Sequence, residues 1–412
     1  MDERRTTVTT GPVARVLDAV LDRVRAGEHP GRLATYIPEL ATVDPERCAL
    51  SLASVFGRSY AAGDAEHEFT IQSISKPFVF ALAVDDLGIG RVRRHVGVEP
   101  SGDAFNAITF DDAGRPMNPM INVGALTTTS LIGAESADQR FERIRLGLSA
   151  FAGRSLQLDE AVYLSEARTG DRNIALAGLA RASGALVGTV ADAADPYFRQ
   201  CSLRVTTTDI AVMGATLAGG GVNPLTGERV ISARAARETL SVMASCGMYD
   251  RSGDWIVEVG LPAKSGVGGG IVAVSPGRFG IGVFSPPLDE VGNSARGVAM
   301  LEALSREFDL HLFNRGVSPV SPIEEVVRDD VSHRILVRLR GELDVVAAER
   351  VSDRLQRVLP WYEAGTIELD LEAVTGIDKI ARTLIAAVLD EGARGGYEVV
   401  LTDPADLLSP PA

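Results

Sequence analysis

The sequence predicts an α/β protein made of two domains. Its 412 residues are more than one hydrophobic core usually organises. Short stretches with strand-like alternation recur between longer stretches with helical spacing, a pattern typical of mixed α/β folds. Around residues 313–322 the composition shifts to Gly, Ser, Val and Pro, which indicates a linker. We therefore expect a large domain over residues 1–312 and a small domain over residues 323–412.

The large domain shows strand and helix patterns separated by glycine-rich turns. Residues 12–26 place aliphatic side chains on one helix face, and Gly88 is a suitable C-cap for a helix that precedes it. The expected helices are 12–26, 75–87 and 292–308. The expected strands are 49–60, 69–72, 255–259, 270–275 and 279–284, with a turn at Gly63 and Asp64 after the first.

In the small domain, strand patterns alternate with helix patterns. The expected strands are 334–339, 366–371 and 397–401, and the expected helices are 345–358 and 379–393. Strands that alternate with helices predict a small parallel or mixed sheet.

Composition excludes several kinds of partner and cofactor. The net charge of -14 would repel nucleic acid and anionic membranes. No apolar stretch spans a bilayer, and no apolar core of a secretory signal follows the polar start. Three cysteines without C-x-x-C spacing favour a reducing compartment, hence the cytoplasm. The five histidines are scattered, so we expect no metal and no other cofactor.

Lysine is rare in this sequence and is therefore informative. Among 41 basic residues only Lys76, Lys264 and Lys379 are lysines. A buried lysine can lose its proton and act as a base, whereas arginine cannot. Lys76 forms a Ser-x-x-Lys motif with Ser73, and Lys264 begins a Lys-Ser-Gly motif directly before an apolar strand. Either motif alone arises readily by chance, but both together in this order favour a serine hydrolase.

The Ser-x-x-Lys spacing suits nucleophilic catalysis. Residues three apart share a helix face, which places the Lys76 amine within hydrogen-bond reach of the Ser73 hydroxyl. A serine becomes a competent nucleophile when a neighbouring base takes its proton. Burial and the nearby ammonium of Lys264 would favour the neutral amine of Lys76. At a helix N-terminus, the backbone N–H of Ser73 can also stabilise an oxyanion.

Ser-x-x-Lys followed by Lys-Thr-Gly is the signature of β-lactamases and penicillin-binding proteins. Those enzymes carry a third motif, Ser-x-Asn, between the other two. No asparagine in this sequence has a serine two residues before it, which weakens the β-lactamase interpretation.

A series of other strings, in order along the chain, resembles the serine-dependent glutaminases. The strings are ATYIPEL (34–40), FTIQSISKP (69–77), EPSG (99–102), NPMINVG (118–124), SE (165–166), GDRN (170–173), TGERV (226–230), SCGMYD (245–250), GLPAKSGV (260–267) and SPPLD (285–289). This resemblance implies a β-lactamase-like fold, with a sheet, flanking helices and a helical subdomain. It also implies hydrolysis of L-glutamine to L-glutamate and ammonia through an acyl-enzyme.

The resemblance to glutaminases implies a role for particular residues. Ser73 would be the nucleophile and Lys76 the base, Tyr249 would relay a proton to ammonia, and Lys264 would keep the Lys76 amine neutral. The implied substrate contacts are Ser73, Asn122, Glu166, Asn173, Tyr197, Tyr249 and the backbone of Val267. A carboxylate suits the α-ammonium of glutamine, while amides and hydroxyls suit its charged groups through hydrogen bonds. Taken singly, these positions also fit turns, caps or core residues with satisfied hydroxyls.

The C-terminal region resembles a STAS domain, the fold of anti-anti-sigma factors. The strings that resemble it are RGELD (340–344), IELDL (367–371), GID (376–378) and YEVVL (397–401). Regulatory members place a phosphorylatable serine just after the aspartate that Asp378 matches, but Lys379 and Ile380 stand there. We therefore expect self-association or docking of a protein partner, with a passive appendage as the alternative.

Two other functions remain open at the sequence level. A β-lactam-reactive or esterase-like hydrolase would share the Ser-Lys pair, and a sensor would bind an amino acid without turnover. The glutaminase resemblance implies a homodimer or homotetramer, and leaves phosphate activation and the preference for glutamine over asparagine undecided.

Overall fold

The structure is a computed structural model. It describes residues 7–8, 12–35, 37–101, 108–314, 321–343, 345–361, 364–377 and 379–408. The chain divides into two compact units, Met1–Asn314 and Arg315–Ala412, and each is described by itself.

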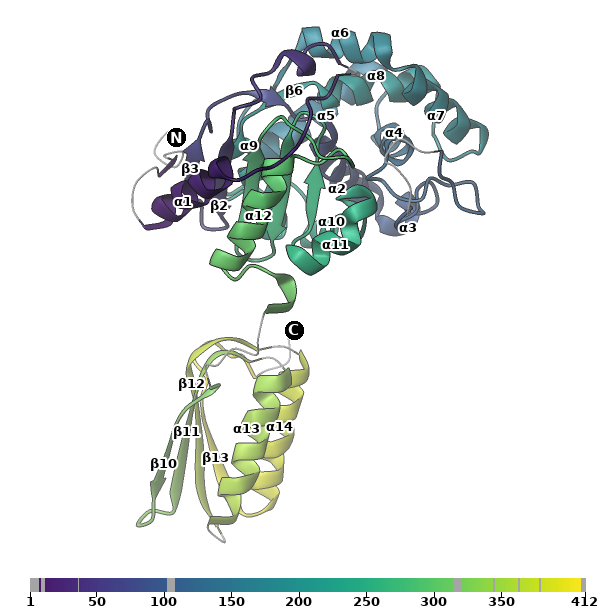
Figure 1. The fold of residues 1–412 in the computed structure, drawn as a ribbon. Coiled ribbons are helices and arrows are strands. Elements are labelled where there is room, and N and C mark those ends of the chain that lie inside the picture. Colours follow the sequence, from purple (N-terminus) through teal and green to yellow (C-terminus); the bar gives the residue numbers. More distant parts are fainter. Residues whose placement is uncertain are drawn as a thin grey trace. The chain divides into compact units, whose positions relative to one another are not determined.

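The first unit is built on a six-stranded sheet with the order β1-β3-β2-β9-β8-β7 (Figure 1). Its strands are β1 (Thr7–Val8), β2 (Ala49–Ser54), β3 (Ser59–Gly63), β7 (Ala263–Ser265), β8 (Gly270–Ser275) and β9 (Phe279–Phe284). β1 pairs with β3 in parallel, and the other neighbours are antiparallel. Strands β2 and β8 are buried along their whole length, because helices cover both faces of the sheet.

Helices α1 (Pro12–Ala26) and α12 (Ala295–Glu307) pack side by side on one face of this sheet (Figure 1). Leu17, Val20, Leu21 and Val24 of α1 share one hydrophobic cluster with residues of α12 and of the sheet. Spacings of three and four residues put those side chains on one helix face. The amphipathic pattern of α1 therefore explains why this helix packs on the sheet.

Helix α9 (Thr207–Ala218) covers the other face at very close range. A Cβ added to Gly280 of β9 would lie 2.1 Å from the carbonyl oxygen of Ala211 and 2.1 Å from the backbone nitrogen of Ala215. Gly214 of the helix faces Gly280 in the same contact. Only glycine allows the helix and strand backbones to approach this closely.

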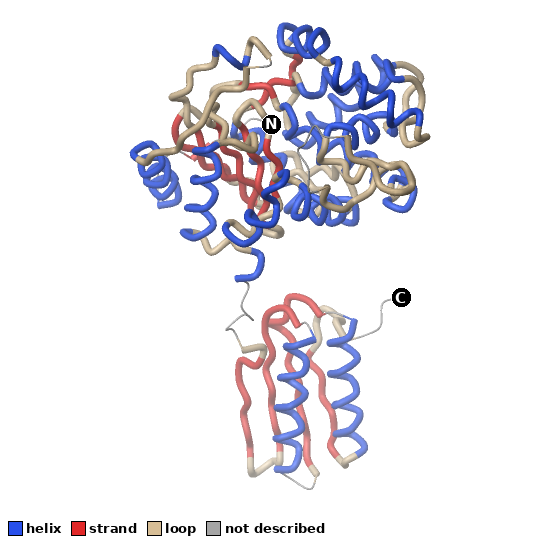
Figure 2. Tube along the Cα trace, turned by 45° about the vertical axis from the view of Figure 1, so that its right-hand side comes forward, coloured by secondary structure: helices blue, strands red, loops and turns tan. Residues whose placement is uncertain are grey.

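Most other helices of the first unit form a helical part beside the sheet (Figures 1 and 2). They are α2 (Ser75–Leu87), α3 (Ile89–Val92), α4 (Asn122–Leu131), α5 (Ala137–Ala152), α6 (Glu160–Thr169), α7 (Asp171–Ala182), α8 (Val190–Cys201), α10 (Ala233–Cys246) and α11 (Ser252–Glu258). A small sheet, with the order β4-β6-β5, lies among them. Its strands are β4 (Phe69–Thr70), β5 (Gln157–Leu158) and β6 (Leu203–Val205).

The second unit is a four-stranded sheet, β10-β11-β12-β13, with two helices on one face (Figure 2). Its elements are β10 (Ile323–Asp329), β11 (Arg334–Leu343), α13 (Val345–Val358), β12 (Gly365–Ile377), α14 (Lys379–Arg394) and β13 (Tyr397–Thr402). β10 is antiparallel to β11, and the other pairs are parallel. The α/β prediction for both units is confirmed, and the second unit has a hydrophobic cluster of its own.

One strand prediction in the first unit was wrong, and two others differ from the structure in extent. Residues 255–259 lie largely in helix α11, where Trp255 and Val259 face the core four residues apart while Val257 is 79% exposed. Residues 49–60 are not one strand, because the chain turns at Gly57, which has φ 87. The strand predicted at 69–72 ends at Thr70, and a 3₁₀ turn over Gln72–Ile74 follows.

Two further differences concern the edges of the units. The helix predicted over 292–308 begins at Ala295, because Ser294 caps it by accepting a hydrogen bond from the backbone N–H of Gly297. Strand β10 was not predicted, since its sequence IEEVVRD carries too many charges to resemble a buried strand. Most of the predicted linker, residues 315–320, lies outside the described residues.

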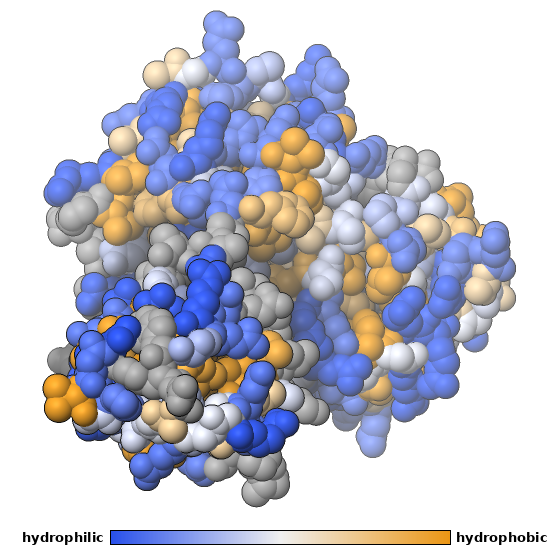
Figure 3. Space-filling model, turned by 90° about the horizontal axis from the view of Figure 1, so that it is seen from below, coloured by the Kyte–Doolittle hydropathy of each residue, from blue (hydrophilic) through white to orange (hydrophobic). Residues whose placement is uncertain are grey.

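On the face shown in Figure 3, hydrophobic residues are interspersed among hydrophilic ones. None of the described helices is both long enough and apolar enough to cross a membrane.

Candidate active site

Ser73 lies in a strained turn at the start of α2. It belongs to the 3₁₀ turn Gln72–Ile74, which runs directly into the helix at Ser75. Gln72 has φ 49, in the left-handed region that a residue with a side chain rarely occupies. Such a conformation costs roughly 1–3 kcal/mol and persists only where surrounding contacts impose it. Ser73 is itself almost fully buried, so the turn presents its hydroxyl inside the protein.

Lys76 is buried, with 1% of its surface exposed. Its Nζ donates hydrogen bonds to Asn122 Oδ1 at 2.6 Å and to the Met120 carbonyl at 3.3 Å. Among the hydrogen bonds of the described residues, none joins Lys76 to Ser73. Burial lowers the pKa of Lys76 to about 8, although the neighbouring Cys201 and Glu166 act in the opposite direction. The amine can therefore be neutral near physiological pH.

Tyr249 connects Ser73 to strand β7. Its hydroxyl donates to the Ser265 carbonyl at 3.1 Å, and it is also hydrogen-bonded to the Ser73 side chain. Since the one phenolic proton goes to Ser265, the Tyr249 oxygen accepts the hydrogen bond from Ser73. Burial raises the pKa of Tyr249, so the phenol stays protonated. Like Gln72, Tyr249 has a left-handed backbone, with φ 58.

Lys264 of β7 is fully buried beside Tyr249. Its Nζ lies 3.9 Å from the centroid of the Tyr249 ring and donates to the Ser265 carbonyl at 2.7 Å. Burial, followed by the charge of Lys76, lowers the pKa of Lys264 well below its ordinary value. Since like charges oppose one another, Lys76 and Lys264 disfavour being protonated together.

A second cluster joins residues of three helices. Asn122 begins α4, and its Nδ2 donates to Asn173 Oδ1 of α7 at 3.0 Å. The Tyr197 hydroxyl of α8 donates to Asn122 Oδ1 at 3.4 Å. Because Asn122 Oδ1 also accepts from Lys76, this cluster is continuous with the lysine.

Glu166 of α6 is the carboxylate among the residues that the glutaminase resemblance implies as substrate contacts. It is buried, and burial raises its pKa to about 7. A hydrogen bond with the Gln72 side chain and the charge of Lys76 favour the ionised form. The carboxyl group therefore changes charge near neutral pH, which makes it responsive to a cationic ligand.

The loop between β7 and β8 brings Val267 to the same turn. A Cβ added to Gly266 would lie 3.2 Å from the Ile71 carbonyl, and one on Gly268 would lie 3.3 Å from the Thr70 carbonyl. Val267 is buried between these two glycines. Within the described part of the chain, its backbone N–H donates to no protein acceptor. This N–H is thus available to a ligand.

The contacts form two sets around the turn at residues 72–76. One set links Ser73, Tyr249 and Lys264. The other links Lys76, Asn122, Asn173 and Tyr197. Glu166 contacts the turn through Gln72, and the Val267 loop packs against it. Sequence reasoning missed Gln72 and Cys201 as neighbours of the site. The position of Gln72 directly before Ser73 was an available signal, whereas nothing in the sequence marks Cys201. In the described ranges, no group of three or more His, Cys, Asp or Glu residues is arranged to hold a metal ion.

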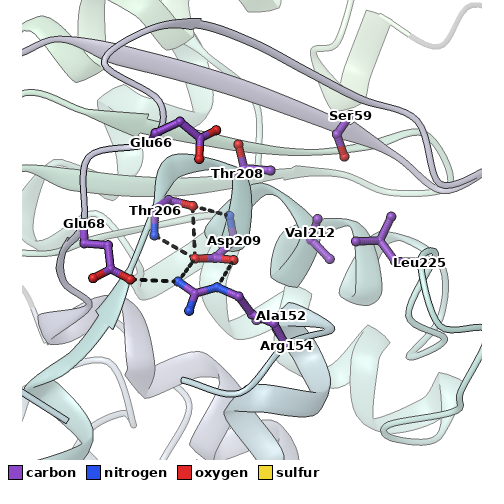
Figure 4. Close-up of a pocket in the computed structure, with 10 residues that line it drawn as sticks. All are labelled: Ser59, Glu66, Glu68, Ala152, Arg154, Thr206, Thr208, Asp209, Val212 and Leu225. Atoms are coloured by element: carbon purple, nitrogen blue, oxygen red, sulfur yellow. Dashed lines mark hydrogen bonds and ion pairs between the residues drawn. The ribbon is translucent and has the colours of Figure 1, made fainter. Parts of the chain in front are cut away.

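A separate polar cavity of about 350 Å³ lies at the N-terminus of α9 and contains none of these residues. Arg154 pairs there with Asp209 and with Glu68 (Figure 4). Asp209 also forms a capping box with Thr206. These charges are engaged in starting the helix, so the cavity has a structural explanation.

The fold and the site together define a β-lactamase-like protein with a buried serine, two buried lysines and a cluster of amides and hydroxyls. The glutaminase family model matches residues 31–313, and the STAS domain model matches residues 323–407. The chain belongs to the glutaminase family. The resemblances noted in the sequence, to glutaminases and to STAS domains, are both confirmed.

Named relatives agree with this assignment. "Glutaminase" of Corynebacterium glutamicum is 42% identical over 401 residues, which are 97% of this chain and 96% of that protein. "Glutaminase 1" of Bradyrhizobium diazoefficiens is 47% identical over 411 residues, but the chain spans only 66% of its length. The solved structure "Crystal Structure Analysis of Mglu" is 41% identical, with a TM-score of 0.84 over 97% of this chain and 100% of that one. "Probable glutaminase ybaS" is 42% identical, with a TM-score of 0.70, and covers 74% of this chain and 99% of its own.

Proposed function

We propose that this protein hydrolyses the side-chain amide of L-glutamine to L-glutamate and ammonia through an acyl-enzyme on Ser73. The observation that carries the proposal is that buried Lys76, three residues after Ser73, is hydrogen-bonded to Asn122 of a cluster suited to an amino acid. A lysine with a pKa of about 8 can act as a base near neutral pH. The family and the names of its relatives support glutamine as the substrate.

In the proposed first half-reaction, neutral Lys76 takes the proton of Ser73 Oγ, directly or through a short rearrangement of its side chain. Ser73 Oγ then attacks the amide carbon of glutamine, and the carbonyl oxygen becomes an oxyanion. The backbone N–H groups of Ser73 and Val267 stabilise that charge. As the C–N bond breaks, Tyr249 passes a proton to the departing ammonia and is reprotonated by Lys76.

In the second half-reaction, water attacks the γ-glutamyl ester. Lys76 takes a proton from the water, and the Ser73 oxygen leaves with a proton to give L-glutamate and free serine. This sequence of steps balances without metal or organic cofactor. Lys264, whose Nζ lies against the Tyr249 ring, holds that phenol in place and disfavours a charge on Lys76.

The remaining residues position the substrate. Glu166 pairs with the α-ammonium, and ionised Glu166 is the form that attracts it. Asn122, Asn173 and Tyr197 supply the hydrogen-bond donors and acceptors that the α-carboxylate and α-ammonium need. In the free protein these groups bond to one another, so substrate binding exchanges those hydrogen bonds for new ones.

The test is to incubate the purified protein with L-glutamine and measure ammonia and glutamate together. We expect release in equal amounts that disappears in Ser73→Ala and in Lys76→Ala. A Ser73→Ala variant that still turns over glutamine would refute the acyl-enzyme. A folded wild-type protein that releases no ammonia, with phosphate supplied, would favour the sensor, and hydrolysis of a chromogenic β-lactam without glutamine turnover would favour the other hydrolase.

The proposal extends to organisation and location. We assign the glutaminase activity to residues 1–312, with residues 323–412 as a module for self-association or partner docking and residues 313–322 as their linker. We also propose a homodimer or homotetramer in the cytoplasm. All three cysteines are free and buried, as expected for a reducing compartment. Asp378 matches the aspartate that precedes the phosphorylatable serine of regulatory STAS domains. It lies outside the described residues.

A further inference from the structure

A chain of buried polar side chains lies behind the strained turn that carries Ser73. The Thr129 hydroxyl of α4 donates to Gln200 Oε1 at 3.1 Å, and Gln200 Nε2 of α8 donates to the Ser75 hydroxyl at 3.3 Å. The Ser75 hydroxyl donates in turn to the Gln72 carbonyl at 2.8 Å. Thr129, Gln200 and Ser75 are all fully buried. The chain ends on the residue whose backbone is left-handed.

The direction of these hydrogen bonds follows from the chemistry of the groups. The single proton of Ser75 Oγ is used on the Gln72 carbonyl, so this oxygen can only accept from Gln200. The amide of Gln200 both accepts and donates, and its orientation is fixed by the two hydroxyls. Hydrogen bonds that run in one direction through a low-dielectric interior strengthen one another.

Gln200 also bridges the elements that carry the candidate site. Thr129 shares α4 with Asn122, Gln200 shares α8 with Tyr197, and Ser75 begins the helix of Lys76. One amide thus bonds to both other elements. Gln200 is fully buried, and both of these hydrogen bonds satisfy its amide within the protein.

We infer that Gln200 is a positioning residue that, through Ser75, holds the Gln72 carbonyl and thereby places the Ser73 nucleophile. The inference rests on the proposed function and extends it to a residue outside the substrate contacts. Gln200 touches neither Ser73 nor the proposed substrate groups in any described hydrogen bond. Its loss should therefore affect the chemical step rather than substrate binding.

The test compares Gln200→Met and Thr129→Val with Thr127→Val in the full-length protein. Thr127 is an equally buried threonine of the same helix, but its hydroxyl donates only to the Val123 carbonyl of its own helix. We expect kcat for glutamine to fall about tenfold or more in Gln200→Met, and several-fold in Thr129→Val, with KM within about twofold of wild type. Thr127→Val should keep kcat near wild type.

The inference is overturned if kcat in Gln200→Met stays within about twofold of wild type, if only KM changes, or if Thr127→Val loses as much as Thr129→Val. If Gln200→Met does not fold, the pair of threonine variants decides. A second measurement is independent of turnover. Crystal structures of the wild type and Thr129→Val should show Gln72 leaving the left-handed region, or occupying two conformations, only in the variant.

That second measurement separates the two claims. A wild-type protein without glutaminase activity refutes the proposed function. The backbone conformation of Gln72 would still show whether the hydrogen bonds from Thr129 through Gln200 hold it in place. An unchanged Gln72 in Thr129→Val and in Gln200→Met overturns the inference even if the wild type is an active glutaminase.

Discussion

At the scale of single residues, the site depends on lysines that the fold keeps away from water. Lys76 is hydrogen-bonded to an amide and a carbonyl rather than to a carboxylate, so the loss of hydration of its charged form outweighs the opposing effects of Cys201 and Glu166. Arginine at either lysine position would stay protonated at any accessible pH. Because lysine is so scarce elsewhere in the chain, both positions stand out in the amino-acid sequence alone.

The first prediction at this scale concerns pH. We expect kcat/KM for glutamine to rise from about pH 6 to about pH 9, because Lys76 must lose a proton near pH 8 to act as a base. Ionisation of Glu166 near pH 7 adds to the rise on the acidic side, since only its carboxylate attracts the α-ammonium. Initial rates at substrate concentrations below KM measure the profile. A rate that stays constant over this range would show that neither group titrates as described.

The second prediction at this scale concerns Lys264. Replacement by Arg forces a permanent charge into a fully buried position, so Lys264→Arg should lower the free energy of unfolding by roughly 2–5 kcal/mol. Lys264→Met has a similar volume without the charge and should cost less than about 1.5 kcal/mol. Urea denaturation of both variants provides the comparison. If both variants lost the same free energy of unfolding, the destabilisation would not come from the charge of arginine.

At the scale of elements, hydrophobic patterns predicted helices α1, α2, α12, α13 and α14, but none of helices α3 to α11. Helix α1 and strands β8 and β9 lie at the residues that the patterns indicated. Helix α11 was mistaken for a strand because four of the five residues 255–259 are apolar, and only the packing of Trp255 and Val259 shows the helical period. A short apolar run carries too little periodicity to distinguish the two.

The arrangement of the site was predictable only in part. Sequence motifs indicated Ser73, Lys76 and Lys264, and the family resemblance added the rest. The left-handed turn at Gln72 and the contact of Lys264 with Tyr249 were not predictable, because no local sequence pattern specifies either one. The same is true of Gln200, whose hydrogen bonds join residues 71 and 125 positions apart.

A prediction at the element scale concerns the close contact of α9 with β9. Gly280→Ala would place a methyl group 2.1 Å from backbone atoms of the helix, so the two elements must separate. We expect a loss of about 3 kcal/mol or more of unfolding free energy, or failure to fold. Gly178→Ala in α7, where nothing lies within 4 Å, is the control and should be neutral or up to about 1 kcal/mol stabilising. A Gly280→Ala variant as stable as this control would contradict the packing.

At the scale of the whole molecule, the two units have separate cores. The STAS-like unit buries its own cluster between one sheet and two helices, and no residue of the first unit belongs to it. The solved structure "Probable glutaminase ybaS" is matched over 99% of its own length but covers only 74% of this chain. The first unit therefore has what a domain needs in order to fold alone.

The corresponding prediction is that a protein ending at Asn314 folds and retains kcat/KM for glutamine within about threefold of the full chain. Its oligomeric state, measured by light scattering beside the full chain, would show whether residues 323–412 mediate association. Loss of activity in a folded truncated protein would indicate that the second unit takes part in the chemistry.

The complete burial of Lys264 makes this residue a chemical record of the protein's history. Cyanate and reducing sugars modify primary amines that they can reach, and Lys264 exposes no surface to them in the native state. Lys76 differs, because a base that acts beside a bound substrate is open to a reagent as small as cyanate. Carbamylated or glycated Lys264 in an aged sample, detected by mass spectrometry, would therefore count the molecules that have opened at least once, including those that have since refolded.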